Sequence, residues 1–260
     1  MNLRRFDRYW NTLGHRDPFN VILIPGVPDK GAWDIDAFFA TGRADALRFM
    51  ADLMRIAPDA GRGRALDFGC GIGRITRALA DHFELVDGVD VARSMIARAR
   101  ELHPGGGQRR CRFHVNRAVD LGCFPTATFD VVYSRLVLQH LTPPVVSSYV
   151  REFLRVLKPG GALMFQLPGV VAIDPEQAFC DAPVTGSALK RHVPGGIVSL
   201  YRRFKYRVVL RHSLARMEMF GMDRVTVESL IAGAGGRLLE VRPDQSHGTE
   251  HPGFEYWATR

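Results

Sequence analysis

The chain has 260 residues, of which 46% are hydrophobic, and 35 Lys and Arg against 27 Asp and Glu give a formal net charge of +8. This is an ordinary globular composition, and the length lies at the upper end for a single hydrophobic core. No window approaches the ~20 apolar residues of a membrane-spanning helix, and the first residues lack the apolar region of a signal peptide. We therefore expect one α/β domain with an insertion, located in the cytoplasm.

Cysteine usage and charge limit the partners. The four cysteines form no Cys-x-x-Cys pair, which disfavours a disulfide framework and a zinc site and predicts no bound metal. The positive charge is compatible with nucleic-acid binding, but only residues 201–207 interleave cations with aromatic side chains. A small molecule is therefore the favoured partner and nucleic acid a less favoured one. The sequence leaves the oligomeric state open.

The expected elements begin after an N-terminal segment that contains Pro18, Pro25 and Pro28, for which we expect irregular structure. From Asp34, a residue suited to an N-cap, apolar residues recur at helical spacing to Met54. Short apolar runs then alternate with helical patterns. Strands are expected at 64–68, 85–91, 112–115, 129–133 and 162–167, and helices at 75–80, 94–102 and 143–157, with Pro-Gly-Gly at 159–161 between the last helix and strand.

This alternation predicts βαβ units and a parallel sheet with helices on both faces. The end of the chain differs, because an expected helix at 225–234 precedes two strands, 237–241 and 254–258, joined by a short polar loop. We therefore predict a seven-stranded, mostly parallel α/β sheet with a closing antiparallel hairpin. The expected parts are an N-terminal lid and helix (1–60), a cofactor-binding core (61–167), an inserted cap (168–215) and a closing helix and hairpin (216–260).

A glycine-rich turn follows the first expected strand, where residues 66–74 read Leu-Asp-Phe-Gly-Cys-Gly-Ile-Gly-Arg. Glycines allow a sharp turn close to a ligand, and the helix after them offers free N–H groups. The spacing is Gly-x-Gly-x-Gly instead of the Gly-x-Gly-x-x-Gly of dinucleotide-binding proteins, and Asp67 lies two residues before the first glycine. Since an acid there would repel a pyrophosphate, the motif favours a ligand with an ammonium group and no phosphate.

A second acid, Asp90, ends the next expected strand, where a carboxylate can accept hydrogen bonds from both hydroxyls of a ribose. Together with Asp67 it predicts a nucleoside with a cationic amino-acid tail. Here the chain resembles the class I S-adenosylmethionine-dependent methyltransferases, and three later motifs extend the likeness in the same order. They are Phe-Asp-Val-Val at 129–132, Leu-Gln-His-Leu at 138–141 and Arg-Val-Leu-Lys-Pro-Gly-Gly at 155–161. The resemblance covers about residues 65–167 and implies a Rossmann-like fold, S-adenosylmethionine as cofactor and S-adenosylhomocysteine as product.

The resemblance also implies which residues bind the cofactor. Asp67 would support the glycine loop and the methionine ammonium, and Asp90 would hold the ribose. The family often has an acid after the third strand, whereas this chain has Asn116 and Arg117, so we expect Asn116 and the backbone near Ala118 to contact the adenine. The full expected set is Asp67, Gly69, Cys70, Gly71, Gly73, Arg74, Asp90, Val91, Met95, Asn116, Arg117, Ala118 and Ser134.

The acceptor site should lie at the carboxyl ends of the strands, where open α/β sheets bind ligands. Methyl transfer is an in-line displacement, and a hydroxyl acceptor must also lose a proton. His140 and His247 are the candidate bases; the alternatives are that His140 supports the cofactor pocket and that His247 lies in a solvated loop. The other expected substrate or lid residues are Trp33, Phe38, Arg43, Arg135, Gln139 and Glu250, with core packing as the alternative for Phe38 and methionine-carboxylate binding for Arg43.

The favoured function is therefore transfer of a methyl group from S-adenosylmethionine to a small-molecule acceptor, with oxygen the favoured acceptor atom. One alternative is an RNA or protein methyltransferase, which the charge favours but no appended binding domain supports. The other is an S-adenosylmethionine-binding protein without catalytic activity. No readable motif in the lid or the cap identifies the acceptor.

Overall fold

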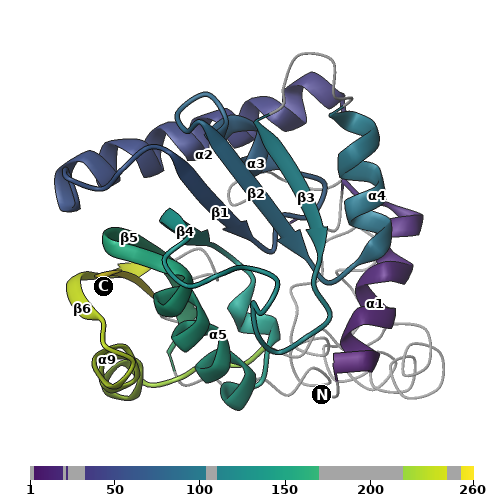
Figure 1. Ribbon diagram of the computed structural model, residues 1–260. Coiled ribbons are helices and arrows are strands. Elements are labelled where there is room, and N and C mark those ends of the chain that lie inside the picture. The colour runs from purple at the N-terminus through teal and green to yellow at the C-terminus, as the bar shows by residue number, and fades with distance from the viewer. Residues whose placement is uncertain (1–2, 20–21, 23–32, 104–109, 170–218, 245–252) are drawn as a thin grey trace, which may run out of the picture.

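A central sheet organises the fold in the computed structural model, which describes residues 3–19, 22, 33–103, 110–169, 219–244 and 253–260. The sheet has seven strands in the order β3-β2-β1-β4-β5-β7-β6 (Figure 1). Neighbouring strands are parallel except β7, which is antiparallel to both β5 and β6. The expected fold class, with its closing hairpin, is confirmed.

The element bounds agree with the expected ones to within a few residues, apart from two differences described below. The strands are β1 (Arg64–Phe68), β2 (Leu85–Asp90), β3 (Cys111–Val115), β4 (Phe129–Ser134), β5 (Leu157–Pro168), β6 (Arg237–Asp244) and β7 (Gly253–Thr259). The helices are α1 (Leu3–Arg16), α2 (Ile35–Ile56), α3 (Arg74–Leu79), α4 (Arg93–Leu102), the short 3-10 helix η1 (Leu138–His140), α5 (Pro143–Val156) and α9 (Arg224–Gly233).

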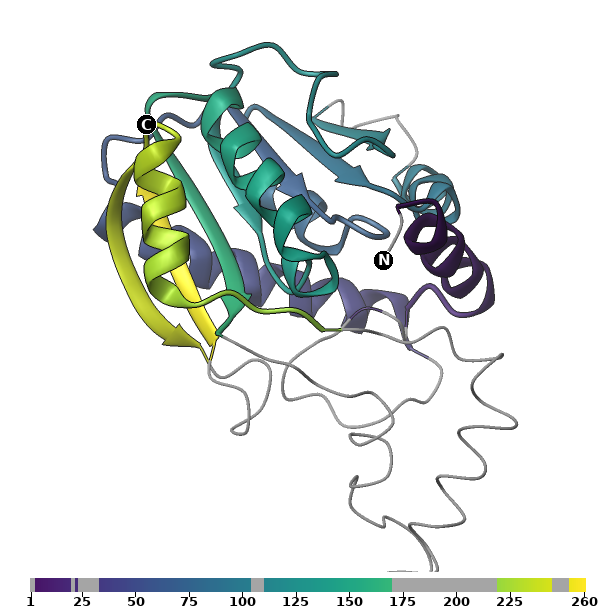
Figure 2. The same ribbon diagram turned by 90° about the horizontal axis from the view of Figure 1, so that it is seen from below.

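Two apolar clusters cover the two faces of the sheet. Leu66 and Val132 point into the cluster that contains α5 and α9, whereas their neighbours Ala65 and Val131 point into the cluster formed with α2 and α3. The alternation follows from the period of two in a strand. Figure 2 shows α5 and α9 on one side of the sheet and α2 on the other. Because both faces are covered, the central strands are apolar runs.

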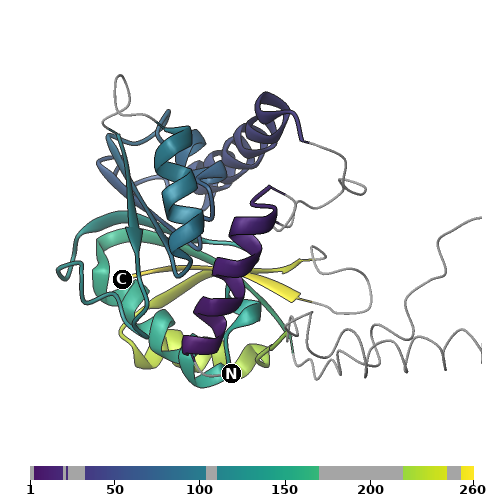
Figure 3. The same cartoon turned by 90° about the vertical axis from the view of Figure 1, so that its right-hand side faces the viewer.

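The N-terminal segment is the first difference, because residues 3–16 form the helix α1 where irregular structure is expected. All three prolines of that segment follow the helix, so none of them interrupts it. Packing also favours the helix, since Gly14 lies so close to α4 that a Cβ atom there would be 2.5 Å from Ser94 Oγ. Figure 3 shows α1 lying beside α4.

The strand β5 is the second difference, because it begins at Leu157 and includes the Pro-Gly-Gly expected to precede it. Leu157 pairs with Phe129 and Ala162 pairs with Val131, so the register between β4 and β5 shifts along this stretch. Gly160 has a φ of 76°, a conformation that glycine adopts without the steric cost of a Cβ. The irregular stretch thus pairs with the sheet despite its turn-like sequence.

Asn11 joins α1 to the first turn of α4. Its Oδ1 accepts a hydrogen bond from Ser94 N at 3.0 Å, and its carbonyl accepts one from Ser94 Oγ at 3.0 Å. The N-cap of α4, Ala92, has no side chain that could satisfy an N–H group at this end. Asn11 therefore supplies the cap from another helix.

Replacing Asn11 with alanine is expected to lower the free energy of unfolding by about 1 kcal/mol, the usual effect of losing a helix cap. Thr12→Ala is the matched control, because the Thr12 hydroxyl donates only to Arg8 O within its own helix. Urea denaturation of both variants measures the difference. Equal stability of the two variants would show that the contact does not hold α1 in place.

Several expected features fall outside the described residues. They are most of the inserted cap, Cys180, the basic stretch 201–207 and the closing loop with His247 and Glu250. Among the helices that the structure describes, none combines the length and apolar composition required to cross a bilayer.

Candidate active site

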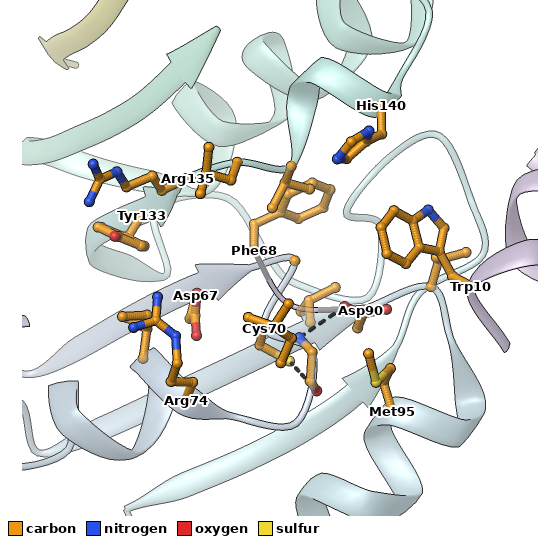
Figure 4. Close-up of a pocket in the computed structure, with 18 of the residues that line it drawn as sticks. Trp10, Asp67, Phe68, Cys70, Arg74, Asp90, Met95, Tyr133, Arg135 and His140 are labelled. Carbon is orange, nitrogen blue, oxygen red and sulfur yellow. Dashed lines mark hydrogen bonds between the residues drawn. The ribbon is translucent and has the colours of Figure 1, made fainter. Parts of the chain in front are cut away.

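A pocket opens at the carboxyl ends of β1, β2 and β4, where the sequence predicts the cofactor site. Figure 4 shows Arg74, Tyr133 and Arg135 on one side of it, Trp10 and His140 on the other, and Cys70 and Asp90 between them. Predicted residues that line this pocket are Asp67, Gly69, Cys70, Gly71, Arg74, Asp90, Val91, Met95, Asn116, Arg135 and His140.

The glycine loop after β1 has a backbone that requires glycine. Gly69 and Gly71 have φ values of 82° and 54°, and a Cβ atom on Gly69 would lie 2.1 Å from Val137 Cγ2. The N–H groups of Gly69 and Cys70 donate to Val89 O at 2.7 and 3.0 Å, and Gly71 N donates to Asp90 Oδ2 at 2.9 Å. Since these N–H groups already have protein acceptors, they do not form the anion cradle of a phosphate-binding loop.

Asp90 connects the glycine loop to the turn after β2. One carboxylate oxygen accepts from Gly71 N at 2.9 Å and the other from Ala92 N at 2.8 Å. Burial raises the pKa of Asp90, and these backbone N–H groups act in the opposite direction. An ionised carboxylate has about four acceptor positions, so about two remain for hydroxyl groups of a ligand in the pocket.

Asp67 lies at the end of β1 and is 3% exposed. Its carboxylate accepts a hydrogen bond from Thr76 Oγ1 at 2.6 Å. Burial raises the pKa of Asp67 to about 6, although the Thr76 hydroxyl and the charge of Arg74 both lower it. A ligand cation beside this carboxylate would favour its ionised form.

The affinity for S-adenosylhomocysteine is therefore expected to depend on pH through Asp67. The predicted contact between the ligand's ammonium group and Asp67 requires the ionised carboxylate, so the dissociation constant should be lowest above pH 6 and rise up to about tenfold per pH unit below 6. In Asp67→Asn, which keeps an acceptor for Thr76, this dependence should disappear between pH 5 and 7. The exposed Asp59→Asn is the control. Calorimetry at four pH values would contradict the role of Asp67 if both variants kept the wild-type dependence.

The same raised pKa has a consequence for the stability of the ligand-free protein. A carboxyl group whose folded pKa exceeds its ordinary value of 3.8 stabilises the fold below that value, and the contribution is lost as the pH rises through about 6. Asp67→Asn should therefore unfold at a higher temperature than the wild type at pH 7.5 and bind the cofactor more weakly.

Two arginines share one acid at the Arg74 side of the pocket. Arg74 is 8% exposed and donates to Asp45 Oδ2 at 2.7 Å and to Thr41 Oγ1 at 3.2 Å. Arg135 lies 3.7 Å from the other oxygen of Asp45 and 3.9 Å from a carboxylate oxygen of Asp244. The shorter of these contacts, between Arg74 and Asp45, holds the Arg74 side chain in one orientation at the edge of the pocket.

His140 and Trp10 face each other at the opposite side. Their rings are 5.3 Å apart, and His140 is 5% exposed. Nε2 of the Gln139 amide lies 3.2 Å from His140 Nε2. An amide NH2 group is only a donor, so His140 Nε2 accepts this hydrogen bond with its lone pair, which favours a ring that carries no proton on Nε2.

Asn116 marks the base of the pocket beyond β3. Its side chain donates to Asp120 O at 2.7 Å, and its Oδ1 accepts from Ala118 N at 3.2 Å. The Tyr149 hydroxyl donates to Ala118 O at 2.5 Å. The loop after β3 is therefore held by its own side chains and by α5, and it presents Asn116 where the family often has an acid.

Eight predicted residues within the described chain do not line the pocket. Arg117 forms an ion pair with Asp7 of α1, and Phe38 is fully buried against Trp33 and other aromatic rings, which agrees with core packing. Arg43 lies in a different cleft. The residues outside the pocket lining are Trp33, Phe38, Arg43, Gly73, Arg117, Ala118, Ser134 and Gln139.

The sequence reasoning missed Trp10, Asp45 and Tyr149, which all line the pocket. A signal existed for Trp10, because the pattern of residues 3–16 is that of an amphipathic helix. No comparable signal existed for Asp45, since an acid within a helix is usually a solvated residue. Its role depends on the approach of α2 to α3.

Metal and thiol chemistry receive no support from the part of the chain that the structure describes. No three His, Cys, Asp or Glu side chains gather there in a metal-binding arrangement. Cys70, Cys111 and Cys123 are free thiols. Burial raises the pKa of Cys70 well above its usual value, so the thiol that lines the pocket is neutral.

Comparison with known proteins identifies the core of the chain. Residues 66–165, which contain the glycine loop, Asp90 and His140, match the family described as "Methyltransferase domain". The match agrees with the resemblance of these residues to the class I S-adenosylmethionine-dependent methyltransferases. The family assignment agrees with the acids and glycines that surround the pocket.

Relatives of this methyltransferase domain act on different acceptors according to their names. N-terminal Xaa-Pro-Lys N-methyltransferase 1 of Rattus norvegicus is 31% identical over 139 residues, which are 51% of this chain and 62% of that protein. The 2-methyl-6-phytyl-1,4-hydroquinone methyltransferase of Synechocystis is 39% identical over 100 residues, 38% of this chain and 30% of that protein. The chain thus spans less than two thirds of these two relatives.

A solved structure of similar fold covers nearly the whole chain. Magnesium protoporphyrin IX methyltransferase from Synechocystis PCC 6803, with bound S-adenosylhomocysteine, has a TM-score of 0.61 and 14% sequence identity over 98% of both chains. At this identity the similarity concerns the fold. It supports the architecture of the sheet and its helices.

Proposed function

We propose that this protein is an S-adenosylmethionine-dependent methyltransferase that acts on a small-molecule acceptor, at an oxygen atom. The observation that carries the proposal is the pair of acids, the buried Asp67 and the half-buried Asp90, on either side of a glycine loop whose N–H groups bind protein acceptors. Such a site disfavours a pyrophosphate and fits a ligand with a ribose and an ammonium group.

In this proposal, different residues bind different parts of the cofactor. Asp90 has free acceptor positions for the ribose hydroxyls, and Met95 and Asn116 line the adjoining wall for the adenine. Asp67 would bind the ammonium group, and Arg74 would bind the carboxylate, since guanidinium pairs well with carboxylate. When bound, S-adenosylmethionine supplies an electrophilic methyl group on a sulfonium that leaves as a neutral thioether.

His140 is the proposed general base. Its Nε2 accepts a hydrogen bond from the Gln139 amide, and when a hydroxyl acceptor takes the place of that amide, Nε2 can take the proton that the hydroxyl loses as its oxygen bonds to the methyl carbon. Burial of the ring against Trp10 excludes water from that side. His247, in the undescribed closing loop, stays the second predicted base.

The small size of the acceptor is supported by the walls of the pocket, which include Trp10 from α1 on one side and Arg135, just after β4, on the other. The name of the Synechocystis relative, a hydroquinone methyltransferase, agrees with a small acceptor. The name of the rat relative favours the second candidate, methylation of a protein amino terminus.

Transfer of a radiolabelled methyl group to fractionated cell extract tests the proposal. We expect the label in the small-molecule fraction, with Asp90→Ala as the inactive control. Label in protein or RNA would contradict the small-molecule acceptor. If no fraction is labelled by a protein that binds the cofactor, the chain is not a methyltransferase.

A further inference from the structure

A second cleft lies between α2 and α3, beyond Arg74. Three of its lining residues are arginines, and the single acid is Asp81. The lining residues are Phe39, Arg43, Arg74, Arg77, Ala78 and Asp81.

The arginines of this cleft carry more positive charge than the neighbouring acids neutralise. Arg74 is paired with Asp45, but no described carboxylate lies within 4.0 Å of Arg43 or Arg77. The Arg77 guanidinium stacks on the Phe39 ring, 4.8 Å from its centroid. Stacking fixes the plane of this side chain and leaves its N–H edge for a ligand.

We propose that this cleft binds an oxyanion, specifically a phosphate group. Arginine N–H groups match the spacing of phosphate oxygens and bind them in pairs. Arg43 comes from α2, and Arg74 and Arg77 come from α3, so donors converge from both walls. Asp81 also lines the cleft, and its carboxylate would repel a second anionic group of a ligand beside it.

Arg74 couples the cleft to the cofactor pocket, because it lines both. The backbone of Arg74 is fixed by close helix packing, since a Cβ atom on Gly42 would lie 2.3 Å from Arg74 O. Its guanidinium is therefore the movable part. A phosphate group in the cleft competes with Asp45 for this guanidinium, draws it from the cofactor side and weakens cofactor binding. The coupling, unlike the anion site itself, rests on the proposed function.

The site is tested by titration with inorganic phosphate in the absence of cofactor, with chloride of equal ionic strength as the reference. The variant Arg43→Gln/Arg77→Gln should raise the dissociation constant for phosphate at least about tenfold. The control Arg98→Gln/Arg151→Gln removes two arginines outside the cleft and should change it less than about twofold. No binding by the wild type, or equal binding by both double variants, would overturn the proposal.

A parallel titration with glycerol 3-phosphate distinguishes the source of the phosphate group. Binding of both compounds indicates recognition of any exposed phosphate, and binding of inorganic phosphate alone indicates the free ion. Either result supports the site if Arg43→Gln/Arg77→Gln abolishes it. If neither compound binds, the site does not exist.

The coupling is tested by titrating S-adenosylhomocysteine with and without saturating phosphate. In the wild type phosphate should raise its dissociation constant about fivefold, and S-adenosylhomocysteine should raise that of phosphate by the same factor. In Arg43→Gln/Arg77→Gln the effect should vanish while phosphate-free affinity is unchanged. If the effect persists there, phosphate acts inside the cofactor pocket and the coupling is wrong. Failure to bind S-adenosylhomocysteine without phosphate would instead contradict the proposed function.

Discussion

Replacing Asp90 with alanine is expected to raise the dissociation constant for S-adenosylhomocysteine at least about 30-fold, which corresponds to about 2 kcal/mol. The variant removes the acceptors proposed for the ribose hydroxyls and leaves those hydroxyls unpaired in a buried site. It also frees Gly71 N and Ala92 N, which both donate to this carboxylate, so the glycine loop loses one of its hydrogen bonds to β2 and keeps those of Gly69 N and Cys70 N to Val89 O. Isothermal calorimetry measures the affinity directly.

Asp87→Asn is the matched control for this experiment. Asp87 is a buried acid on the same strand, but it pairs with Arg64 and His114, each at 2.7 Å, and lies outside the cofactor pocket. This control should lose stability and keep its affinity for S-adenosylhomocysteine within about twofold. Equal affinities of the Asp90→Ala and wild-type proteins would show that Asp90 does not bind the cofactor.

Replacing His140 with glutamine is expected to lower turnover by about 100-fold or more, with little change in cofactor affinity. Glutamine keeps a polar side chain but cannot take up a proton at neutral pH. The wild-type rate should rise with pH as His140 loses its proton and becomes able to act as a base, and this rise should be absent in the variant. Initial rates between pH 5.5 and 8.5 measure both effects.

The control is His82→Gln, the same chemical change at a histidine outside both clefts. It should keep the wild-type rate and pH profile. Normal turnover of His140→Gln, with an unchanged dependence of the rate on pH, would contradict the role of His140 as the general base. Transfer would then depend on proximity alone, as it does for an amine or an acceptor that is already ionised.

Much of the core was predictable because its signals are local. Glycines at 69 and 71 have positive φ values, and this need is visible in the Gly-x-Gly-x-Gly spacing. Asp67 and Asp90 end two neighbouring parallel strands, and the topology of such strands brings their ends to one edge of the sheet. The position of both acids beside the pocket therefore follows from the sequence and this topology.

The remaining site residues depend on packing between distant segments. Trp10 reaches the pocket because α1 packs on α4, where Asn11 bonds to Ser94 and Gly14 approaches the same residue closely, and no sequence spacing encodes that packing. Arg43 and Arg74 were equivalent candidates for a carboxylate from sequence, yet the side chain of Arg43 faces a separate cleft. Which of the two arginines lines the cofactor pocket depends on how α2 packs on α3. Gly42 allows the tight approach of these two helices and so fixes the direction of each side chain.

Titration of the wild-type protein with S-adenosylmethionine, and in parallel with a nicotinamide dinucleotide, tests the central claim most directly. The acids beside the glycine loop and the absence of free N–H groups at Gly69, Cys70 and Gly71 lead us to expect micromolar, one-site binding of S-adenosylmethionine and no measurable binding of the dinucleotide. Calorimetry that detects no S-adenosylmethionine binding, or a preference for the dinucleotide, would contradict the assignment of this pocket.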